Sequence, residues 1–360
     1  MVEKRGQVAM EFLMTYGWAI LIILIAVGAL WMLGVFSPST PSSCSVEAPF
    51  SCQDVLIDEA GATLRIALAG GFTGSVSSVK VNGEDCEGLY GAGSIKGGQV
   101  SNIRCVKPSL EKGEPVSITF EGMSSKPGGF NKPFEGVATG EVKGAVSPTQ
   151  TFDPSMVAAY DFEDGANDVG ENGNDGVISG ADCTISGVVG NACSFDGIDD
   201  RIEISASTSL NSWTNKITVS AWVYMSDYGG GDSFNAIAGQ REGCGVGNWQ
   251  LYADGGASNE VYFSFWDTGS ANRVCTSGTV LPLNTWKHVA ATYDGSKISI
   301  YVDGSPAAPC PFTQSMRATS LKTYIGDESC SNDFNGKIDE VVIYNRVLSS
   351  EEIKAHAEIK

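Results

Sequence analysis

The chain has 360 residues, a length that predicts two or three folded units rather than one small domain. Its 42 acidic and 23 basic side chains give a formal net charge of −19. This charge argues against nucleic acid or an anionic membrane surface as partner of the soluble part, because such partners are bound through Lys and Arg. Hydrophobic residues make up 42% of the sequence, which excludes a disordered acidic chain.

The first predicted element is a membrane-spanning helix. Residues 12–36 contain no charged side chain, and about 20 apolar residues suffice to cross a bilayer. Lys4 and Arg5 precede this run and the next basic residue is Arg65, so the positive-inside rule keeps the short N-terminus in the cytoplasm. We therefore expect a cell-membrane protein whose C-terminal domains are extracellular.

The segment before this helix is short, basic and ends in a glycine. Its basic run, Met-Val-Glu-Lys-Arg-Gly, ends at Gly6, and a lone carboxylate, Glu11, stands at the start of the apolar run. The pattern is similar to the class III signal peptide of archaeal type IV pilin-like proteins, in which a prepilin peptidase cuts after the glycine. The resemblance implies a leader of residues 1–6, a mature chain that begins at Gln7, and a filament-core helix over residues 7–36.

The resemblance also assigns Glu11 to filament assembly, as the fifth residue of the mature chain. A carboxylate at the edge of a membrane helix costs a few kcal/mol unless it is paired, and the freed amine of Gln7 on a neighbouring helix would pair with it. The alternative is an ordinary signal anchor that is never processed, in which Glu11 only reaches the cytosolic interface beside Arg5.

All ten cysteines follow the helix, four in the first stretch and six in the second. Even counts outside the membrane predict disulfides, and the two histidines and missing Cys-x-x-Cys spacing disfavour zinc. The sequence leaves connectivity open, although Cys183–Cys193, Cys244–Cys275 and Cys310–Cys330 are the pairings with the shortest separations. The first group is Cys44, Cys52, Cys86 and Cys105.

Two Pro- and Ser-containing stretches, residues 37–43 and 146–155, predict linkers. Between them, residues 44–145 contain short alternating runs separated by Gly, Asn and Pro clusters, namely 63–68, 76–81 and 116–120. These runs predict a small disulfide-bonded β-sandwich, the expected head domain of a pilin. No motif in it indicates a chemical site.

Residues 156–360 form the last predicted domain, and it carries most of the charge. Residues 151–360 hold 28 acidic and 12 basic side chains, a net of −16, whereas 44–150 hold 12 and 9, a net of −3. Residues 217–225 alternate cleanly, which predicts a strand with one apolar face made of Ile217, Val219, Ala221, Val223 and Met225.

Turn and cap signals complete this domain. Asp294-Gly295 lies between two strand-like runs and predicts a hairpin, and Asp303-Gly304 closes the second run. Ser349 and Glu352 have the spacing of a capping box, which predicts the start of a short terminal helix.

Five motifs of this domain resemble the LamG-like, concanavalin A-like lectin/glucanase superfamily. They are Phe195-Asp-Gly-Ile-Asp-Asp200, 217–223, 286–295, 300–304 and 336–353. The resemblance implies a two-sheet antiparallel jelly roll over residues 156–360. The expected fold class is therefore mainly β, with an N-terminal transmembrane α-helix, a small β-sandwich head and a C-terminal jelly roll.

Binding is favoured over catalysis in this domain. Hydrolases of the superfamily that this domain resembles usually carry Glu-x-Asp-x-x-Glu on one strand. That spacing does not occur in the sequence. His288 and His356 have no nucleophile near them in sequence. A polysaccharide-degrading enzyme is therefore the least favoured alternative, and we expect no enzymatic activity.

Candidate ligand residues come from aromatic patterning. Tyr262 and Trp266 share the strand face opposite Val261, Phe263 and Phe265, and aromatic rings stack on the apolar faces of sugars. The expected ligand-binding set is Trp249, Tyr262, Trp266, Arg241 and Arg273. Alternation does not reveal which face is exposed to solvent, so a core role for Trp249, Tyr262 and Trp266 stays open. Trp222 and Trp286 lie inside family motifs and are expected to be core residues.

Calcium is the one expected cofactor. LamG-like domains often bind it at the sandwich rim, and it needs six to eight oxygen ligands. The resemblance places Glu163, Asp164, Asp168 and Asp339 at acidic positions where such sites tend to occur. The alternative is that these are plain solvated loops of an acidic protein.

The sequence as a whole predicts a pilin-like surface filament subunit or adhesin. Its expected partners are prepilin peptidase, other pilin subunits, the membrane through the N-terminal helix, and an extracellular glycan or surface protein, but no nucleic acid. The alternative is an unprocessed, membrane-anchored surface binding protein that never polymerises.

Overall fold

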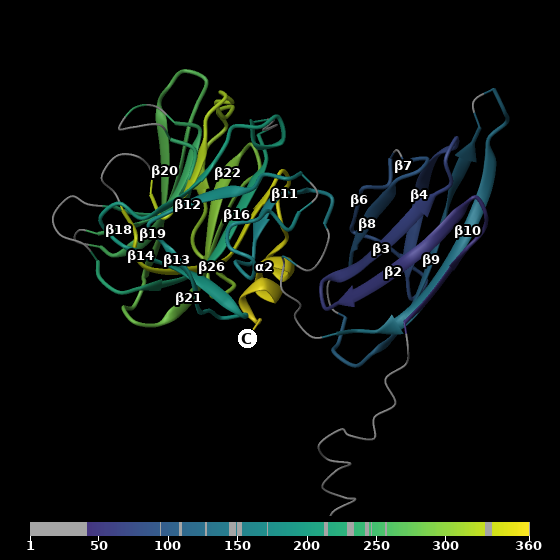
Figure 1. Ribbon diagram of the computed structural model, residues 1–360, viewed down its shortest axis with the longest axis horizontal. Coiled ribbons are helices and arrows are strands. Elements are labelled where there is room, and N and C mark those ends of the chain that lie inside the picture. The colour runs from purple at the N-terminus through teal and green to yellow at the C-terminus, as the bar shows by residue number, and fades with distance from the viewer. Residues whose placement is uncertain are drawn as a thin grey trace, which may run out of the picture. The chain divides into compact units, whose positions relative to one another are not determined.

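The computed structural model describes residues 42–360 except 94, 108–109, 127, 144–148, 150–152, 171, 212–214, 229–233, 242–244, 246, 256–257, 328–332 and 360. The described chain is built mainly of strands (Figure 1). The predicted leader, the helix over residues 7–36 and Glu11 lie outside it. Within the described ranges, no helix has both the length and the apolar character needed to cross a membrane.

Ten strands between residues 43 and 141 form a β-sandwich, here called the head sandwich. The order is β1-β10-β9-β4-β5 in one antiparallel sheet, with β7 beside β4, and β2-β3-β8-β6 in the other. The strands are β1 (Ser43–Val46), β2 (Phe50–Asp58), β3 (Gly61–Leu68), β4 (Thr73–Val81), β5 (Glu84–Asp85), β6 (Gly88–Tyr90), β7 (Ile95–Lys96), β8 (Val100–Val106), β9 (Pro115–Ser125) and β10 (Lys132–Glu141).

The head sandwich follows its apolar alternation. Val116, Ile118 and Phe120 of β9 are buried while the residues between them are exposed, so one face of the sheet packs against the other sheet. The three predicted runs fall inside β3, β4 and β9, which confirms these strands. Disulfides Cys44–Cys52 and Cys86–Cys105 add covalent links.

The strands from residue 156 onward form a second sandwich of two antiparallel sheets, a jelly-roll-like arrangement as expected. The nine-stranded sheet has the order β13-β14-β26-β16-β21-β22-β23, with β11 beside β26 and β24 beside β22. Its strands are β11 (Met156–Tyr160), β13 (Asp182–Ser186), β14 (Asn191–Asp196), β16 (Ile217–Met225), β21 (Trp286–Tyr293), β22 (Lys297–Val302), β23 (Ser305–Pro306), β24 (Cys310–Pro311) and β26 (Asn335–Tyr344).

The seven-stranded sheet has the order β12-β15-β25-β17-β18-β19-β20. Its strands are β12 (Gly176–Ser179), β15 (Arg201–Ile204), β17 (Phe234–Gly239), β18 (Trp249–Asp254), β19 (Glu260–Trp266), β20 (Asn272–Val280) and β25 (Thr323–Ile325). The inner faces of the two sheets enclose one large apolar core.

Strand β16 confirms the alternation prediction. It runs from Ile217 to Met225, and its five apolar residues at alternate positions all lie in the core between the sheets. The Asp294-Gly295 turn joins β21 to β22, where Gly295 has a φ of +89°, a value that glycine adopts without steric cost. The two predicted turns are therefore present.

Helix α2 (Ser350–Ala357) lies on the outer face of the nine-stranded sheet, where Ile353 packs against Val342 and Tyr344. The predicted capping box is confirmed: Ser349 Oγ accepts from the Glu352 N–H at 3.2 Å, and Glu352 accepts from the Ser349 N–H at 2.9 Å.

Arg346 fixes the start of α2 to the preceding chain. Its guanidinium donates to Asp153 at 2.5 Å and to the two oxygens of Glu352 at 2.6 and 2.8 Å. All three side chains are buried. Because both carboxylates meet one cation, the charges of this buried cluster depend on Arg346.

The disulfides of the second sandwich correct part of the expected connectivity. Cys183–Cys193 forms as predicted, whereas Cys275 bonds to Cys310, which overturns the pairings Cys244–Cys275 and Cys310–Cys330. Cys275 is on β20, the edge of the seven-stranded sheet, and Cys310 is on β24, at the edge of the other sheet. The bond joins the two sheets, so sheet topology outweighs sequence separation. Cys244 and Cys330 lie outside the described residues.

Candidate functional site

Two neighbouring strands of the seven-stranded sheet present a polar and aromatic surface on the side away from the core. Gln250 of β18 stands opposite Ser264 of β19, and Tyr252 stands opposite Tyr262. The alternate residues of both strands belong to the core, so the pleat sends these four side chains outward. We call the four residues the tyrosine face.

The two tyrosine rings of this face are fixed by contact with each other. Their centroids are 5.4 Å apart and their planes are 16° from parallel, and Phe234 packs edge-on against Tyr252 at 5.1 Å. The Tyr262 hydroxyl shares a hydrogen bond of 3.1 Å with Ser258, which in turn donates to Asp254 at 2.6 Å. A rigid aromatic platform of this kind binds a flat apolar surface with little loss of side-chain entropy.

Ser264 supplies an unused polar group beside this platform. Its side chain is 0% exposed, and its Oγ has no hydrogen-bond partner among the described residues. A buried hydroxyl without a partner costs free energy, on the order of 1–3 kcal/mol. Ser264 is therefore a buried polar group beside the tyrosines that the described part of the fold leaves unsatisfied.

Three other predicted ligand residues, Trp266, Arg241 and Arg273, are held by contacts within the fold. Trp266 lies on the outward side of β19 yet is only 6% exposed, with the Arg241 guanidinium 5.4 Å from its ring centroid. Arg241 also donates to the Gly245 carbonyl at 3.2 Å, and Arg273 donates to Asp267 at 2.6 and 2.9 Å. Both arginines are thus engaged within the fold.

The assignment of Trp249 to the ligand-binding set is wrong. It pairs across the sheet with Phe265, so the register puts it on the inner face, where it is 0% exposed in the core. The expectation for Trp286 is also wrong, because this side chain is only half-buried and lies on the outer face of the nine-stranded sheet. A motif can identify a strand without telling which of its residues face inward.

Two of the carboxylates expected to bind calcium, Asp168 and Glu163, accept hydrogen bonds from the backbone. Asp168 accepts the N–H groups of Ala159, Gly170 and Asn174 at 2.8–2.9 Å, and these contacts shape the loop after β11. Glu163 accepts the Asn191 N–H at 2.9 Å. These are the hydrogen bonds that order the rim loops of the sandwich.

Asp339 is buried in β26 and also binds backbone. It accepts the N–H groups of Val188 and Val189 at 2.8 and 3.1 Å. Burial raises the pKa of Asp339 to about 6, and the charge of Glu163 adds to the increase. Within the described part of the chain, no three of Glu163, Asp164, Asp168 and Asp339 bring carboxylate oxygens within 4.8 Å of one another.

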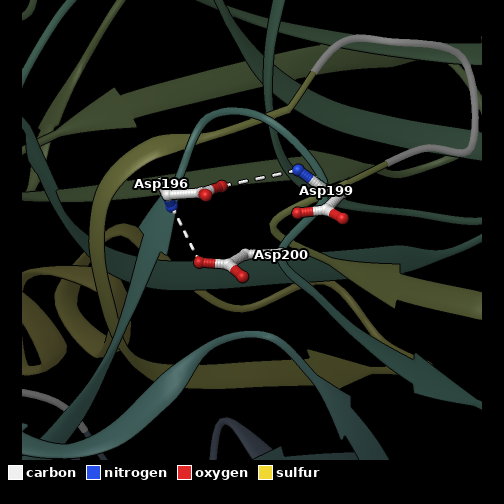
Figure 2. Close-up of side chains that lie close together, drawn as sticks. All are labelled: Asp196, Asp199 and Asp200. Atoms are coloured by element: carbon white, nitrogen blue, oxygen red, sulfur yellow. Dashed lines mark hydrogen bonds between the residues drawn. The ribbon is translucent and has the colours of Figure 1, made fainter.

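A different group of carboxylates does converge, in the loop between β14 and β15. Oxygens of Asp196, Asp199 and Asp200 all lie within 4.8 Å of one another. Figure 2 shows how the loop holds them: the Asp196 N–H donates to Asp200 at 2.9 Å, and the Asp199 N–H donates to Asp196 at 3.4 Å. We call these three residues the acidic loop.

Electrostatics indicates that the acidic loop is crowded with negative charge. Burial raises the pKa of Asp200, and the charges of Asp196 and Asp199 add to the increase. Nearby, burial and the neighbouring Asp327 raise the pKa of Asp333 to about 6. Carboxylate oxygens are the hard ligands that Ca²⁺ prefers, so these residues fit a calcium ion better than a softer metal. The sequence signal was present, as three aspartates within five residues, but it was used only to identify the fold.

A match to a known protein family falls within the second sandwich. Residues 196–354 match the family model described as the concanavalin A-like lectin/glucanases superfamily. Residues 196–354 of the second sandwich are therefore similar to the LamG-like, concanavalin A-like lectin superfamily, which supports that resemblance. The matched residues make up less than half of the chain.

Several solved structures are similar to part of the chain. The binding domain of Paraclostridial Mosquitocidal Protein 1 is 15% identical, with 56% of this chain and 52% of that chain covered and a TM-score of 0.47. Domain 4 of AbnA, a GH43 extracellular arabinanase from Geobacillus stearothermophilus in complex with arabinotriose, is 19% identical, with 57% and 98% covered and a TM-score of 0.46.

The receptor binding domain of a botulinum neurotoxin C/D mosaic serotype is 14% identical, with 57% and 51% covered and a TM-score of 0.46. The chain thus spans about half the length of the first structure and of this one. Among curated proteins, none matches the sequence.

Proposed function

We propose that this protein is a cell-surface subunit that binds an extracellular glycan, free or on a surface protein, through the tyrosine face of its lectin domain. The observation that carries the proposal is the stacked pair of Tyr252 and Tyr262 on the outward side of the sheet, next to the unused hydroxyl of Ser264.

The chemistry of the face suits binding rather than hydrolysis. Sugar rings stack their apolar faces on aromatic rings, and the Ser264 hydroxyl beside the tyrosine pair would hydrogen-bond a sugar hydroxyl. Glycoside hydrolysis normally requires two carboxylates flanking the scissile bond, and none of the four side chains of the tyrosine face is a carboxylate.

A glycan array tests this proposal. The protein and its Tyr262→Ala variant are applied to the same array, with Phe130→Ala in the head sandwich as a matched aromatic control, since Phe130 is 97% exposed. We expect one class of glycan to bind the parent protein and the control alike, and to bind Tyr262→Ala about tenfold more weakly. Equal signals from all three proteins would contradict the proposal.

The proposed mode of display is a processed, pilin-like helix. Gly6, Gln7 and Glu11 support it, and the four described disulfides fit an oxidising, extracellular setting. Helices that pack without closing a ring generate a filament, and a weak glycan site repeated along it gains avidity.

Mass spectrometry of the native protein separates this mode from an unprocessed membrane anchor. The filament proposal expects an N-terminus at Gln7, and loss of both processing and surface fibres in Gly6→Leu. An N-terminus at Met1 would leave the anchored binding protein as the correct alternative.

The proposal includes calcium at the acidic loop. The ion would neutralise the mutual repulsion of Asp196, Asp199 and Asp200 and hold the loop between β14 and β15. A ligand present at about 100 times its Kd stabilises a fold by about 2.7 kcal/mol, so Ca²⁺ should raise the Tm of the lectin domain. The shift should be lost in Asp199→Asn and kept in Glu163→Gln, whereas loss in Glu163→Gln alone would place the ion at the originally predicted residues.

A further inference from the structure

The outer face of the nine-stranded sheet holds a groove that helix α2 leaves uncovered. Ile353 of α2 covers the part of this face formed by Val342 and Tyr344, and the helix ends at Ala357. Beside that end lies a cavity of about 530 Å³, a size that accommodates small ligands. We call it the tryptophan groove; it is lined by Val188, Trp222, Trp286, Lys287, Asp303 and Ala357.

Aromatic rings form the floor of this groove. Trp286 of β21 stands opposite Tyr224 of β16, with the ring centroids 5.6 Å apart. Trp222 is the next outward residue of β16, and its Nε1 donates to the His356 carbonyl at 3.3 Å. Because α2 already satisfies that N–H, Trp222 offers the groove only its ring, and Trp286 remains half-buried beside it.

An ion pair forms one edge of the groove. Lys287 Nζ lies 2.6 Å from Asp303 Oδ2, and the other oxygen of Asp303 accepts the His288 N–H at 3.1 Å. The two side chains remain 27% and 43% exposed. Asp303 is therefore an acceptor held in place by the backbone, with an ammonium donor next to it, and both are accessible to a ligand.

From this arrangement we propose that the tryptophan groove binds one ring of a neutral pyranose glycan, as a site separate from the tyrosine face. The apolar face of the sugar stacks on Trp286, one hydroxyl donates to Asp303, and a neighbouring hydroxyl accepts from Lys287. A neutral ligand is favoured because Asp303 balances Lys287, and because residues 151–360 carry a net charge of −16 that repels polyanions.

The proposal does not depend on the tyrosine face. The two surfaces lie on the outer faces of opposite sheets of one sandwich. A glycan chain bound at either surface, or two chains bound at both, would give one domain two points of attachment. Each surface can therefore fail its test without affecting the other.

Fluorine NMR of the full chain labelled with 5-fluorotryptophan tests the groove. The chain has seven tryptophans, and the Trp286 resonance is assigned from its absence in Trp286→Phe. The probes are cellohexaose, xylohexaose, mannohexaose and chitohexaose. We expect at least one of them to shift the Trp286 resonance at up to about 10 mM, the weak end of lectin-type affinity.

Two variants make the result specific. Asp303→Asn keeps the shape of the side chain and tolerates the φ of +49° found at this turn, because Asn adopts positive φ readily. It should weaken the binding that is read out at Trp286 about tenfold, while Tyr262→Ala should leave it unchanged.

Three outcomes would overturn the proposal. They are no shift of the Trp286 resonance with any of the four hexasaccharides, equal affinity in Asp303→Asn, and a shift produced only by a proline hexapeptide, which would make the groove a peptide site. If Tyr262→Ala abolished binding while the Trp286 resonance never moved, the groove would be excluded and the tyrosine face retained.

Discussion

The two sheets of the lectin domain bury their inner faces in one shared core but differ in what their outer faces do. On the seven-stranded sheet, Tyr252 is only 7% exposed and stacks on the half-buried Tyr262, and Ser264 has no partner among the described residues. Beside the nine-stranded sheet, Arg346, which follows β26, pairs with Glu352 of helix α2 and holds that helix. Arg346 and Glu352 therefore serve the fold, whereas the Ser264 hydroxyl serves no other described residue.

The largest expected effect is a loss of stability when Arg346 is replaced. Arg346→Ala would leave Asp153 and Glu352 as buried, unpaired carboxylates, which should lower the free energy of unfolding by about 3–5 kcal/mol. Urea denaturation followed by tryptophan fluorescence measures it, because residues 43–141 of the head contain no tryptophan. A loss below about 1 kcal/mol would show that α2 does not depend on this cation.

The next effect is a pH dependence of the same helix region. Both histidines are buried next to each other, His288 on β21 and His356 on α2, with ring centroids 6.4 Å apart. Burial lowers the pKa of His288 to about 3, and the charge of His356 lowers it further. Burial lowers the pKa of His356 to about 3, and the charge of Arg346 contributes to this decrease. His288 also faces Trp222 and shares a 3.0 Å hydrogen bond with Ser220.

The direction of this pH dependence follows from the unfolded state, in which the pKa of histidine is about 6.5. Between about pH 6.5 and 3 the unfolded chain binds more protons, so stability is complete above 6.5 and falls as the pH drops, by about 1.4 kcal/mol per pH unit for each histidine. His356→Gln should remove one histidine's share of this slope. An unchanged slope in urea melts from pH 7 to 4.5 would show that His356 is not buried in its neutral form.

The smallest expected effect on stability comes from replacing Ser264. Ser264→Ala removes a buried hydroxyl that has no partner in the described chain, so the lectin domain should keep its stability or gain up to about 1 kcal/mol. The same variant should bind its glycan more weakly. A stability loss above about 1 kcal/mol would mean that Ser264 serves the fold and not a ligand.

Local patterns were sufficient for much of the fold. The alternation in residues 217–225 predicted both the bounds and the buried face of β16, and Ser349 and Glu352 predicted the start of α2. These features depend on neighbours within a few residues, which the sequence displays directly. The family resemblance added the sheet architecture of the second sandwich.

Features that depend on pairing between distant strands were not predictable. Trp249 was assigned to a ligand set because nothing local reveals that it stands opposite Phe265. Cys275 bonds to Cys310 because two sheet edges meet there. For the same reason the sequence did not separate carboxylates that bind backbone, such as Asp168, from those that converge in the acidic loop.

An equilibrium titration shows whether the stacked tyrosines bind a glycan, as proposed for the tyrosine face. The strongest glycan from the array is titrated against the parent protein, Tyr252→Ala, Tyr262→Ala and the double variant. Because the rings act as one platform, each single change should raise the Kd about tenfold, and the double change should add little more. A Kd that stays the same in all four proteins would contradict the claim.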